Sequence, residues 1–299
     1  MVEGRLRPAA IVFTGGRITA VVDHGDAPAG TTDFGDLVVM PALVDTHVHV
    51  NEPGRSDWEG FSTATAAARA GGVASIVDMP LNSIPATTTV AALEAKRQAA
   101  GGAGLSVDVG FWGGIVPGNL AEVAGLAAAG VRGFKCFLVA SGVDEFPAIG
   151  FDDLDAALTA TAAVGLPLLI HAESPAVIAA APAAGAGYSS YLASRPPEAE
   201  VAAIAAVIAA TRRTGGRAHI LHLSAADALP LIAQAVRDGV RISAETCPHY
   251  LAFCAEDIGD DDFSFKCAPP IRDAGNRERL WEGLAAGTID MVVSDHSPC

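Results

Sequence analysis

The sequence is poor in basic residues. Its 19 lysine and arginine residues are outnumbered by 34 aspartate and glutamate residues, which gives a formal net charge of −15. Nucleic acids and anionic membrane surfaces are bound through positive fields that this composition does not supply. We therefore expect neither nucleic acid nor membrane as a partner.

Long hydrophobic runs and paired cysteines are also missing. Every apolar stretch of about 18 residues is interrupted by a charged residue, a proline or a glycine, which argues against a membrane-spanning helix. The first residues include Arg5 and Arg7 but lack the apolar core and cleavage site of a secretory signal. The five cysteines do not have the spacing of a disulfide framework or a zinc ribbon; they are Cys136, Cys247, Cys254, Cys267 and Cys299. We expect a cytoplasmic protein with reduced thiols.

Apolar runs alternate along the chain with segments of helical spacing, which favours βα units around a parallel sheet. Hydrophobic residues make up 51% of the 299 residues, enough for a large core. The expected strands are Leu43–Val50, Ala74–Pro80, Val107–Ile115, Gly133–Leu138, Pro167–Glu173, Ala218–Ser224, Arg241–His249 and Met291–Pro298. Eight strands predict an α/β fold, a TIM-like (β/α)8 barrel over residues 41–299.

Segments rich in alanine, leucine, glutamate and arginine lie between these strands and predict the outer helices. They are Ser62–Ala70, Val90–Ala100, Leu120–Ala129, Asp152–Ala163, Glu198–Arg213, Ala225–Arg237 and Gly275–Ala286. The gaps 174–217 and 250–290 exceed one crossover helix, so we expect extra helices or loops there, over the mouth of the barrel.

The two ends of the chain depart from this alternation. Residues 1–40 contain short β-like pieces and predict a small N-terminal β element, part of a β-sandwich domain; the pieces are Ala10–Thr14, Arg17–Val22 and Leu37–Met40. The eighth strand runs to Cys299 with no helix after it. We expect a chain truncated after strand eight, whose uncovered apolar face promotes aggregation.

His47 and His49 come at the end of the first expected barrel strand. Side chains at i and i+2 share one face of a strand, so both imidazoles point into the barrel. Two hydrogen-bonded core histidines would be the structural interpretation. Because catalytic residues collect at the carboxyl ends of barrel strands, we favour a metal half-site.

Other strand ends carry matching groups. His171 and His222 end two neighbouring apolar strands, and Asp295 ends the eighth, where Met291 and Val293 would share its face. Because side chains alternate along a strand, His219 and His296 would point to the face opposite that of His222 and Asp295. We therefore expect both to lie outside the set that binds metal.

Lys135 lies within the apolar strand Gly133–Leu138. An unpaired buried ammonium costs several kcal/mol, so its charge must be removed or paired. A buried lysine has a lowered pKa and becomes a neutral nucleophile. Reaction with carbon dioxide would give a carbamate whose two oxygens bridge two cations; a buried carboxylate partner is the simpler alternative.

Taken in order, these motifs resemble the cyclic-amide hydrolase branch of the amidohydrolase superfamily, which includes dihydroorotases, hydantoinases and allantoinases, and they are most similar to the allantoinases. The stretches that carry the resemblance are residues 40–49, 51–55, 58–61, 71–73, 77–83, 133–135, 171–173, 222–224, 245–250, 266–270 and 294–298. The resemblance covers nearly the whole chain from Val38 onward.

The resemblance implies a binuclear metal centre. His47 and His49 would bind one ion with Asp295, His171 and His222 the other, and carboxylated Lys135 would bridge both. Two such ions make hydroxide available near neutral pH, and Asp295 would act as general acid and base. Zinc suits these ligands, with manganese, cobalt or iron as alternatives. The resemblance also implies a homo-oligomer, a tetramer.

The residue at position 51 bears on the choice of substrate within this family. Dihydroorotases place an arginine at the position of Asn51 to bind the substrate carboxylate. A neutral amide cannot form that bidentate ion pair but can hydrogen-bond a neutral ring, which favours allantoin. Backbone groups near Cys267 and Ser297 resemble those that hold the ring amides. A hydantoinase is the alternative enzyme, and a non-catalytic scaffold the alternative class.

Overall fold

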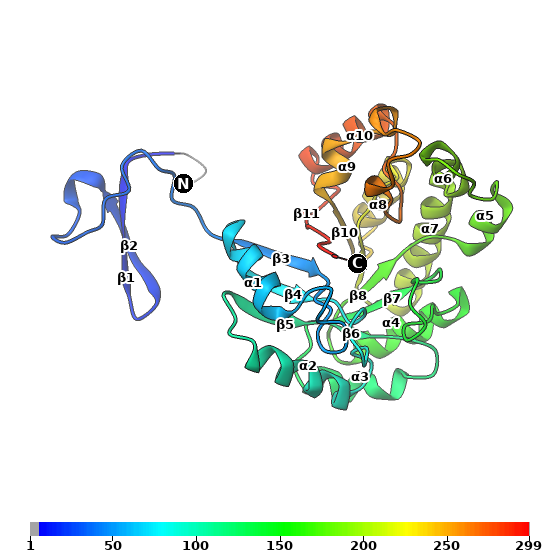
Figure 1. The fold of residues 1–299 in the computed structure, drawn as a ribbon, viewed down its shortest axis with the longest axis horizontal. Coiled ribbons are helices and arrows are strands. Elements are labelled where there is room, and N and C mark those ends of the chain that lie inside the picture. Colours follow the sequence, from blue (N-terminus) through cyan, green and yellow to red (C-terminus); the bar gives the residue numbers. More distant parts are fainter. Residues whose placement is uncertain (1–5, 299) are drawn as a thin grey trace. The chain divides into compact units, whose positions relative to one another are not determined.

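The computed structural model describes residues 6–298, so the thiol expected at Cys299 lies outside the described residues. Backbone packing divides the chain into two units, with the boundary between Leu43 and Val44. Figure 1 shows the elements of each unit along the chain. The four described cysteines form no disulfide.

Among its described residues, the first unit contains one antiparallel hairpin, formed by β1 (Ala9–Thr14) and β2 (Arg17–Asp23). Its two-residue turn is Gly15-Gly16, with φ of 60° and 75°, a conformation that glycine adopts without strain. The prediction of a third β piece at Leu37–Met40 is wrong. These four residues belong to no described strand and their side chains are exposed, because a short apolar run forms a strand only where a neighbouring edge pairs with it.

Nine strands form two sheets in the second unit. The smaller sheet has the order β3-β4-β5, and the larger has the order β11-β10-β9-β8-β7-β6. The bounds are β3 (Leu43–Val48), β4 (Val73–Asp78), β5 (Asp108–Phe111), β6 (Gly113–Gly114), β7 (Phe134–Phe137), β8 (Leu168–His171), β9 (Ala218–Ile220), β10 (Ile242–Thr246) and β11 (Met291–Val292). The ladders from β4 to β5 and from β6 to β11 are parallel.

The expected strand Val107–Ile115 is divided at Trp112 into β5 and β6. β5 pairs with β4, whereas β6 pairs with β7, so this one segment runs from the first sheet to the second. At the opposite edges, Val48 at the end of β3 forms a parallel bridge with His296, and the His49 amide donates to the His296 carbonyl at 2.8 Å. The two sheets are therefore joined at both sides.

Each expected helix is present, and three of them begin with a 3-10 turn. The helices are α1 (Phe61–Ala70), α2 (Val90–Gly102), α3 (Val123–Ala128), α4 (Leu154–Ala163), α5 (Pro175–Ala180), α6 (Tyr188–Ser194), α7 (Pro197–Thr214), α8 (Leu229–Arg237), α9 (Pro248–Ala252) and α10 (Ala274–Ala285). The short α5, α6 and α9 lie in or beside the two long gaps. Among the described residues, no helix is long and apolar enough to cross a membrane.

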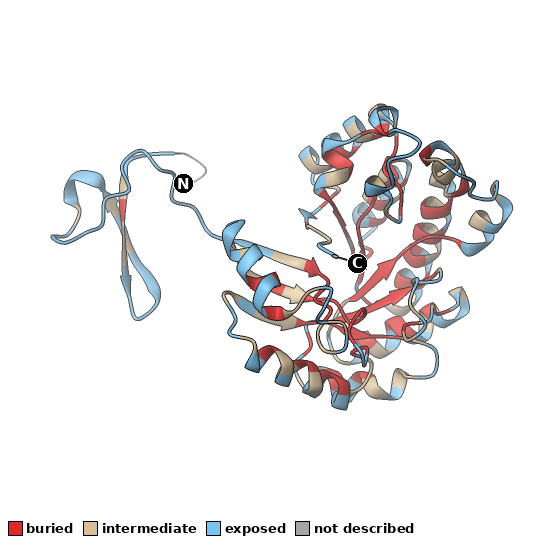
Figure 2. Ribbon diagram, viewed as in Figure 1, coloured by how far each residue is buried: buried red, intermediate tan, exposed pale blue. Residues whose placement is uncertain are grey.

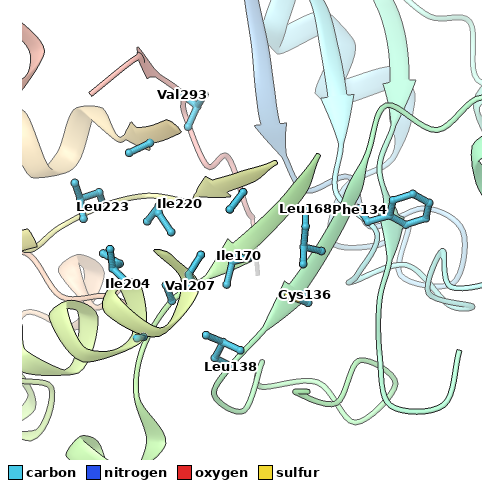
Figure 3. Packing of buried hydrophobic residues seen from close by; sticks show 14 of the residues in the cluster. Phe134, Cys136, Leu138, Leu168, Ile170, Ile204, Val207, Ile220, Leu223 and Val293 are labelled. Atoms are coloured by element: carbon cyan, nitrogen blue, oxygen red, sulfur yellow. The ribbon is translucent and has the colours of Figure 1, made fainter. Parts of the chain in front are cut away.

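The main hydrophobic core lies between the larger sheet and its helices. Figure 2 shows that the central strands of the larger sheet, β7 to β9, and the sheet-facing sides of the helices are buried, whereas the edge strand β11 is exposed. Leu168 and Ile170 of β8 pack with Ile204 and Val207 of α7 in one cluster, as seen in Figure 3. Because side chains alternate along a strand, Leu169 and His171 point to the other face, toward the interior that the strands surround.

A buried ion pair fixes the segment after β3. Lys96 of α2 and Asp78 at the end of β4 are both fully buried, with 2.6 Å between Nζ and Oδ2. The other Asp78 oxygen accepts from the Val50 amide at 2.7 Å. The contact positions the backbone between His49 and Asn51.

Candidate metal centre

The end of β3 and the segment that follows β11 bring His47, His49 and Asp295 together. One Asp295 carboxylate oxygen lies 3.0 Å from His47 Nε2 and 3.4 Å from His49 Nε2. Both imidazoles are buried, while the Asp295 side chain is 23% exposed. Donor atoms of His47, His222 and Asp295 all lie within 4.8 Å of one another, close enough to bind one ion.

His171 and His222 form the second half of the cluster. His171 ends β8, and its Nδ1 lies 3.1 Å from His222 Nε2. The strand that was expected to reach Ser224 ends at Ile220, and His222 has a φ of 35°. Its ring is 5.4 Å from that of His47 and 4.6 Å from that of His171, so it joins the two halves.

Strand alternation does not explain how His222 and Asp295 reach the cluster. In β9 the interior position is that of His219, and Leu221, which follows the strand, packs in the interior cluster. The eighth barrel strand, β11, ends at Val292. Val293, expected to share the face of Asp295, instead packs in the cluster between sheet and helices. Positive φ values at both residues, 35° and 50°, turn their side chains toward His47.

Lys135 lies in the middle of β7 and is 1% exposed. Its Nζ is 3.4 Å from His47 Nε2 and 4.9 Å from the centre of the Phe137 ring. Burial lowers the pKa of Lys135 to about 8, although Asp295 and Glu245 act in the opposite direction. Its amine therefore loses a proton far more readily than that of an exposed lysine.

Two buried glutamates contact the second ring nitrogens of His47 and His171. Glu245 Oε1 lies 2.6 Å from His47 Nδ1, and Glu173 Oε2 lies 2.7 Å from His171 Nε2. Sequence reasoning missed both roles. The available signal was a carboxylate within or directly after an apolar strand, because such a group requires a hydrogen-bond partner.

Neighbouring charges give His47 and His49 different pKa values. Burial, with Lys135 beside it, lowers the pKa of His49 to about 3. Burial also lowers the pKa of His47, but the carboxylates of Asp295 and Glu245 outweigh it, and the pKa lies above its ordinary value. Burial would raise the pKa of Asp295, yet the facing imidazole of His47 keeps it well below its ordinary value, so the carboxylate is ionised at neutral pH.

Asn51 is fully buried two residues beyond His49, and neither atom of its side-chain amide has a hydrogen-bond partner among the described residues. Buried amides are almost always paired, so an unpaired one indicates a place for a ligand or water. The Cys267 carbonyl accepts from the Tyr191 hydroxyl at 2.6 Å. Ser297 is exposed, with its Oγ 3.5 Å from Asn82 Nδ2.

A family model described as the amidohydrolase family matches residues 38–298. The chain belongs to the amidohydrolase family. Amidohydrolases are metal-dependent, and the donor set fits that property: buried imidazole nitrogens and an ionised carboxylate converge from separate strand ends. The strand and helix order is that of an α/β fold of the TIM-barrel type.

Three relatives that are similar to this amidohydrolase in sequence are allantoinases. The chain is 54% identical over 296 residues to the allantoinase of Streptomyces avermitilis, 47% over 294 to the mitochondrial allantoinase of Aquarana catesbeiana and 43% over 317 to the allantoinase of Saccharomyces cerevisiae. These matches cover 98%, 97% and 100% of this chain. The chain spans 66%, 60% and 69% of the respective relatives.

Solved structures of other amidohydrolases share the fold. The L-hydantoinase (dihydropyrimidinase) from Arthrobacter aurescens superposes with a TM-score of 0.89 at 35% identity, over 96% of this chain and 65% of that one. The D-hydantoinase from Bacillus sp. AR9 gives a TM-score of 0.83 at 30% identity, over 97% and 65%.

The two histidines that the sequence predicts to lie outside the metal-binding set, His219 and His296, have other partners for their ring nitrogens. His296 Nε2 lies 2.6 Å from Glu59, and the two nitrogens of His219 lie 2.7 Å from Ser243 Oγ and 3.0 Å from Glu245 Oε2. His219 points into the interior, beneath the cluster rather than away from it, a position that parity alone did not reveal.

Proposed function

We propose that the chain is the barrel portion of an allantoinase, which hydrolyses the hydantoin ring of allantoin to allantoate. The observation that carries the proposal is the convergence of six side chains from five strands and the segments that directly follow them in a chain 54% identical to an allantoinase. Residues 1–40 would form part of a small β-sandwich domain. A cytoplasmic location and a homotetramer stay predictions.

The proposed ligands divide as the two halves of the cluster do. His47, His49 and Asp295 would hold one divalent ion, and His171 and His222 the second. Lys135, carboxylated by carbon dioxide, would contact both. Zinc suits the imidazole nitrogens, with manganese, cobalt or iron as alternatives. Such a pair of ions lowers the pKa of bound water toward neutrality and polarises a carbonyl.

Asp295 would move the proton. Its carboxylate is ionised and partly exposed beside His47 and His49, so it can accept a proton from the attacking water. Water adds to the ring carbonyl carbon, the carbon–nitrogen bond breaks, and Asp295 returns the proton to the departing ring nitrogen. Every atom of the water is then present in the product.

Asn51 supports a neutral substrate. Its buried, unpaired amide can donate one hydrogen bond and accept another, as a ureido or hydantoin edge requires. A carboxylate there would be desolvated with no cation from this position. Backbone groups near Cys267 and Ser297 would hold the other amides of the ring. A hydantoinase is the alternative, supported by the fold shared with L-hydantoinase.

The test compares allantoin, hydantoin and dihydroorotate on the same preparation, extended by the segment that the relatives have beyond this chain. Allantoin should have the highest kcat/KM, and dihydroorotate should fall roughly tenfold to a hundredfold below it, because one charge-assisted hydrogen bond is missing. Asn51→Arg should lower allantoin turnover. A higher kcat/KM for hydantoin would favour the alternative enzyme.

Metal analysis tests the centre separately and excludes a scaffold protein. Preparations supplied with bicarbonate should contain about two ions per chain. Lys135→Ala should lose most of the metal and the activity, and a small carboxylate should restore part of both. Unchanged metal content in Lys135→Ala would eliminate the bridging role.

A further inference from the structure

Four side chains form an unbroken hydrogen-bonded line from the candidate metal centre to the beginning of the strands. His47 Nδ1 contacts Glu245 Oε1 at 2.6 Å, and Glu245 Oε2 contacts His219 Nε2 at 3.0 Å. His219 Nδ1 in turn lies 2.7 Å from Ser243 Oγ. Only the first of these four residues belongs to the proposed ligands.

Strand register places the line. His219 of β9 pairs directly with Ser243 of β10, so both point to the interior. Glu245, two residues further along β10, points the same way and lies one step nearer the centre. The hydrogen-bonded line therefore runs along the interior face of β9 and β10, from Ser243 toward the candidate metal centre.

The proton positions along the line follow from Glu245. Each of its two carboxylate oxygens lies within hydrogen-bonding distance of an imidazole nitrogen, one of His47 and one of His219, and a carboxylate so placed accepts a hydrogen bond from both rings. His47 must then donate from Nδ1 and His219 from Nε2. That leaves His219 Nδ1 as an acceptor, and the Ser243 hydroxyl donates to it. When His47 is neutral, its lone pair lies on Nε2, which faces Asp295 and Lys135.

We propose that His219 and Ser243 are positioning residues that hold His47 in the tautomer able to bind metal through Nε2. The proposal rests on the metal centre of the proposed function. Carboxylates that orient metal-binding histidines are a general feature of metal sites, and here a second imidazole orients the carboxylate.

Packing alone does not hold the His219 ring. His219, Ser243 and Glu245 line a cavity of about 380 Å³ at the beginning of the strands, together with Thr46, Leu169 and Met291. Since one side of the ring borders this cavity, the two hydrogen bonds determine its orientation. A leucine at this position would leave one Glu245 oxygen without its donor.

The experiment compares His219→Leu with His219→Gln. The amide of glutamine can donate to Glu245 where the imidazole did, whereas leucine cannot. The zinc dissociation constant should rise roughly 10–100-fold in the leucine variant and stay within about threefold in the glutamine variant. His24→Leu, a substitution in the first unit, is the matched control and should leave zinc binding unchanged.

Nitrogen-15 NMR of the metal-free protein gives a second readout, at a pH where titration shows His47 to be neutral. His47 should be protonated at Nδ1 in the unsubstituted protein and in His219→Gln, and should populate both tautomers in His219→Leu. An unchanged tautomer in His219→Leu, or equal zinc loss in both variants, would overturn the proposal. If His219→Leu does not fold, Ser243→Ala replaces it, with a shift of the His219 tautomer expected and its absence counting against the line.

The two readouts also separate this proposal from the proposed function. Should the unsubstituted protein bind no zinc at these histidines while the His47 tautomer still follows residue 219, the metal centre fails and the positioning role stands. Normal zinc binding with a tautomer independent of residue 219 gives the reverse.

Discussion

His47 and His171 each point one ring nitrogen at the cluster and the other at a buried glutamate, but the two glutamates have different further partners. Glu245 contacts the imidazole of His219, which is 9% exposed. Glu173 contacts the guanidinium of Arg195, which is 20% exposed. In the half containing His47, the second partner of the glutamate is therefore an imidazole, whose proton can lie on either nitrogen. In the half containing His171, it is a guanidinium with a permanent positive charge.

The difference concerns what each glutamate tolerates. An imidazole can donate from either nitrogen, so His219 can adapt to a changed partner by moving its proton to Nδ1. A guanidinium only donates hydrogen bonds and does not lose its charge, so the group that faces Arg195 must be a hydrogen-bond acceptor. We therefore expect the half containing His47 to be adaptable and the half containing His171 to be intolerant.

The largest expected effect comes from Arg195→Met. It leaves the fully buried Glu173 carboxylate without its cation, and breaking a buried pair costs about 3–5 kcal/mol. Because Arg195 keeps some exposure, we expect the lower end, about 3 kcal/mol of unfolding free energy, measured by urea denaturation. Arg195→Lys, which keeps the charge, is the control. A stable methionine variant would remove the charge-based half of the comparison.

Glu173→Gln and Glu245→Gln sharpen the comparison directly. His171 and Arg195 both contact Glu173 Oε2, whereas Oε1 has no hydrogen-bond partner among the described residues. The glutamine carbonyl would take the place of Oε2, and its N–H group would take the place of Oε1, leaving an unsatisfied buried donor that costs about 1–3 kcal/mol. At position 245 the amide would face His219, which can shift its proton to Nδ1 and donate to Ser243. We expect Glu245→Gln to lose less than about 1 kcal/mol in thermal and urea unfolding. Equal losses would contradict the distinction between the two halves.

A pair in which both side chains are partly exposed gives the smallest effect and a reference for the pairs with a fully buried glutamate. Arg55 contacts Glu145 and the Asn82 carbonyl, and its hydrogen bond keeps the pKa of Glu145 below its ordinary value. The folded pKa is the lower one, so the stabilisation is present above pH 4.5 and is lost as the pH falls through the folded pKa. Glu145→Gln should cost about 1 kcal/mol or less at pH 7. The difference from the unsubstituted protein should shrink below pH 4.5; a constant difference would exclude the ion pair as its cause.

The alternation of strands and helices was predictable because buried parallel strands are continuous apolar runs and helices have a different period. The positions of His47, His49 and His171 near strand ends, and of Lys135 within an apolar strand, could also be predicted. Two kinds of feature could not. Leu37–Met40 has the composition of a strand, but pairing depends on a neighbour that local sequence does not specify.

The second kind is backbone conformation at His222 and Asp295. The sequence expectation continued each strand through these residues, and the structure ends both strands earlier and turns the side chains inward through positive φ. Neither residue is glycine, so composition carries no sign of the turn. Glu173, Glu245 and Arg195 were missed because the partners of a buried carboxylate are distant in sequence.

The buried lysines have a practical consequence for handling the protein. The sequence contains three lysines, and the structure buries Lys96 and Lys135 almost completely while leaving Lys266 exposed. Amine-reactive dyes and cross-linkers attack neutral, accessible amines. In the folded second unit such reagents reach one lysine side chain, on the segment between α9 and α10, so a label or a surface attachment there is confined to a single point and leaves the centre unmodified.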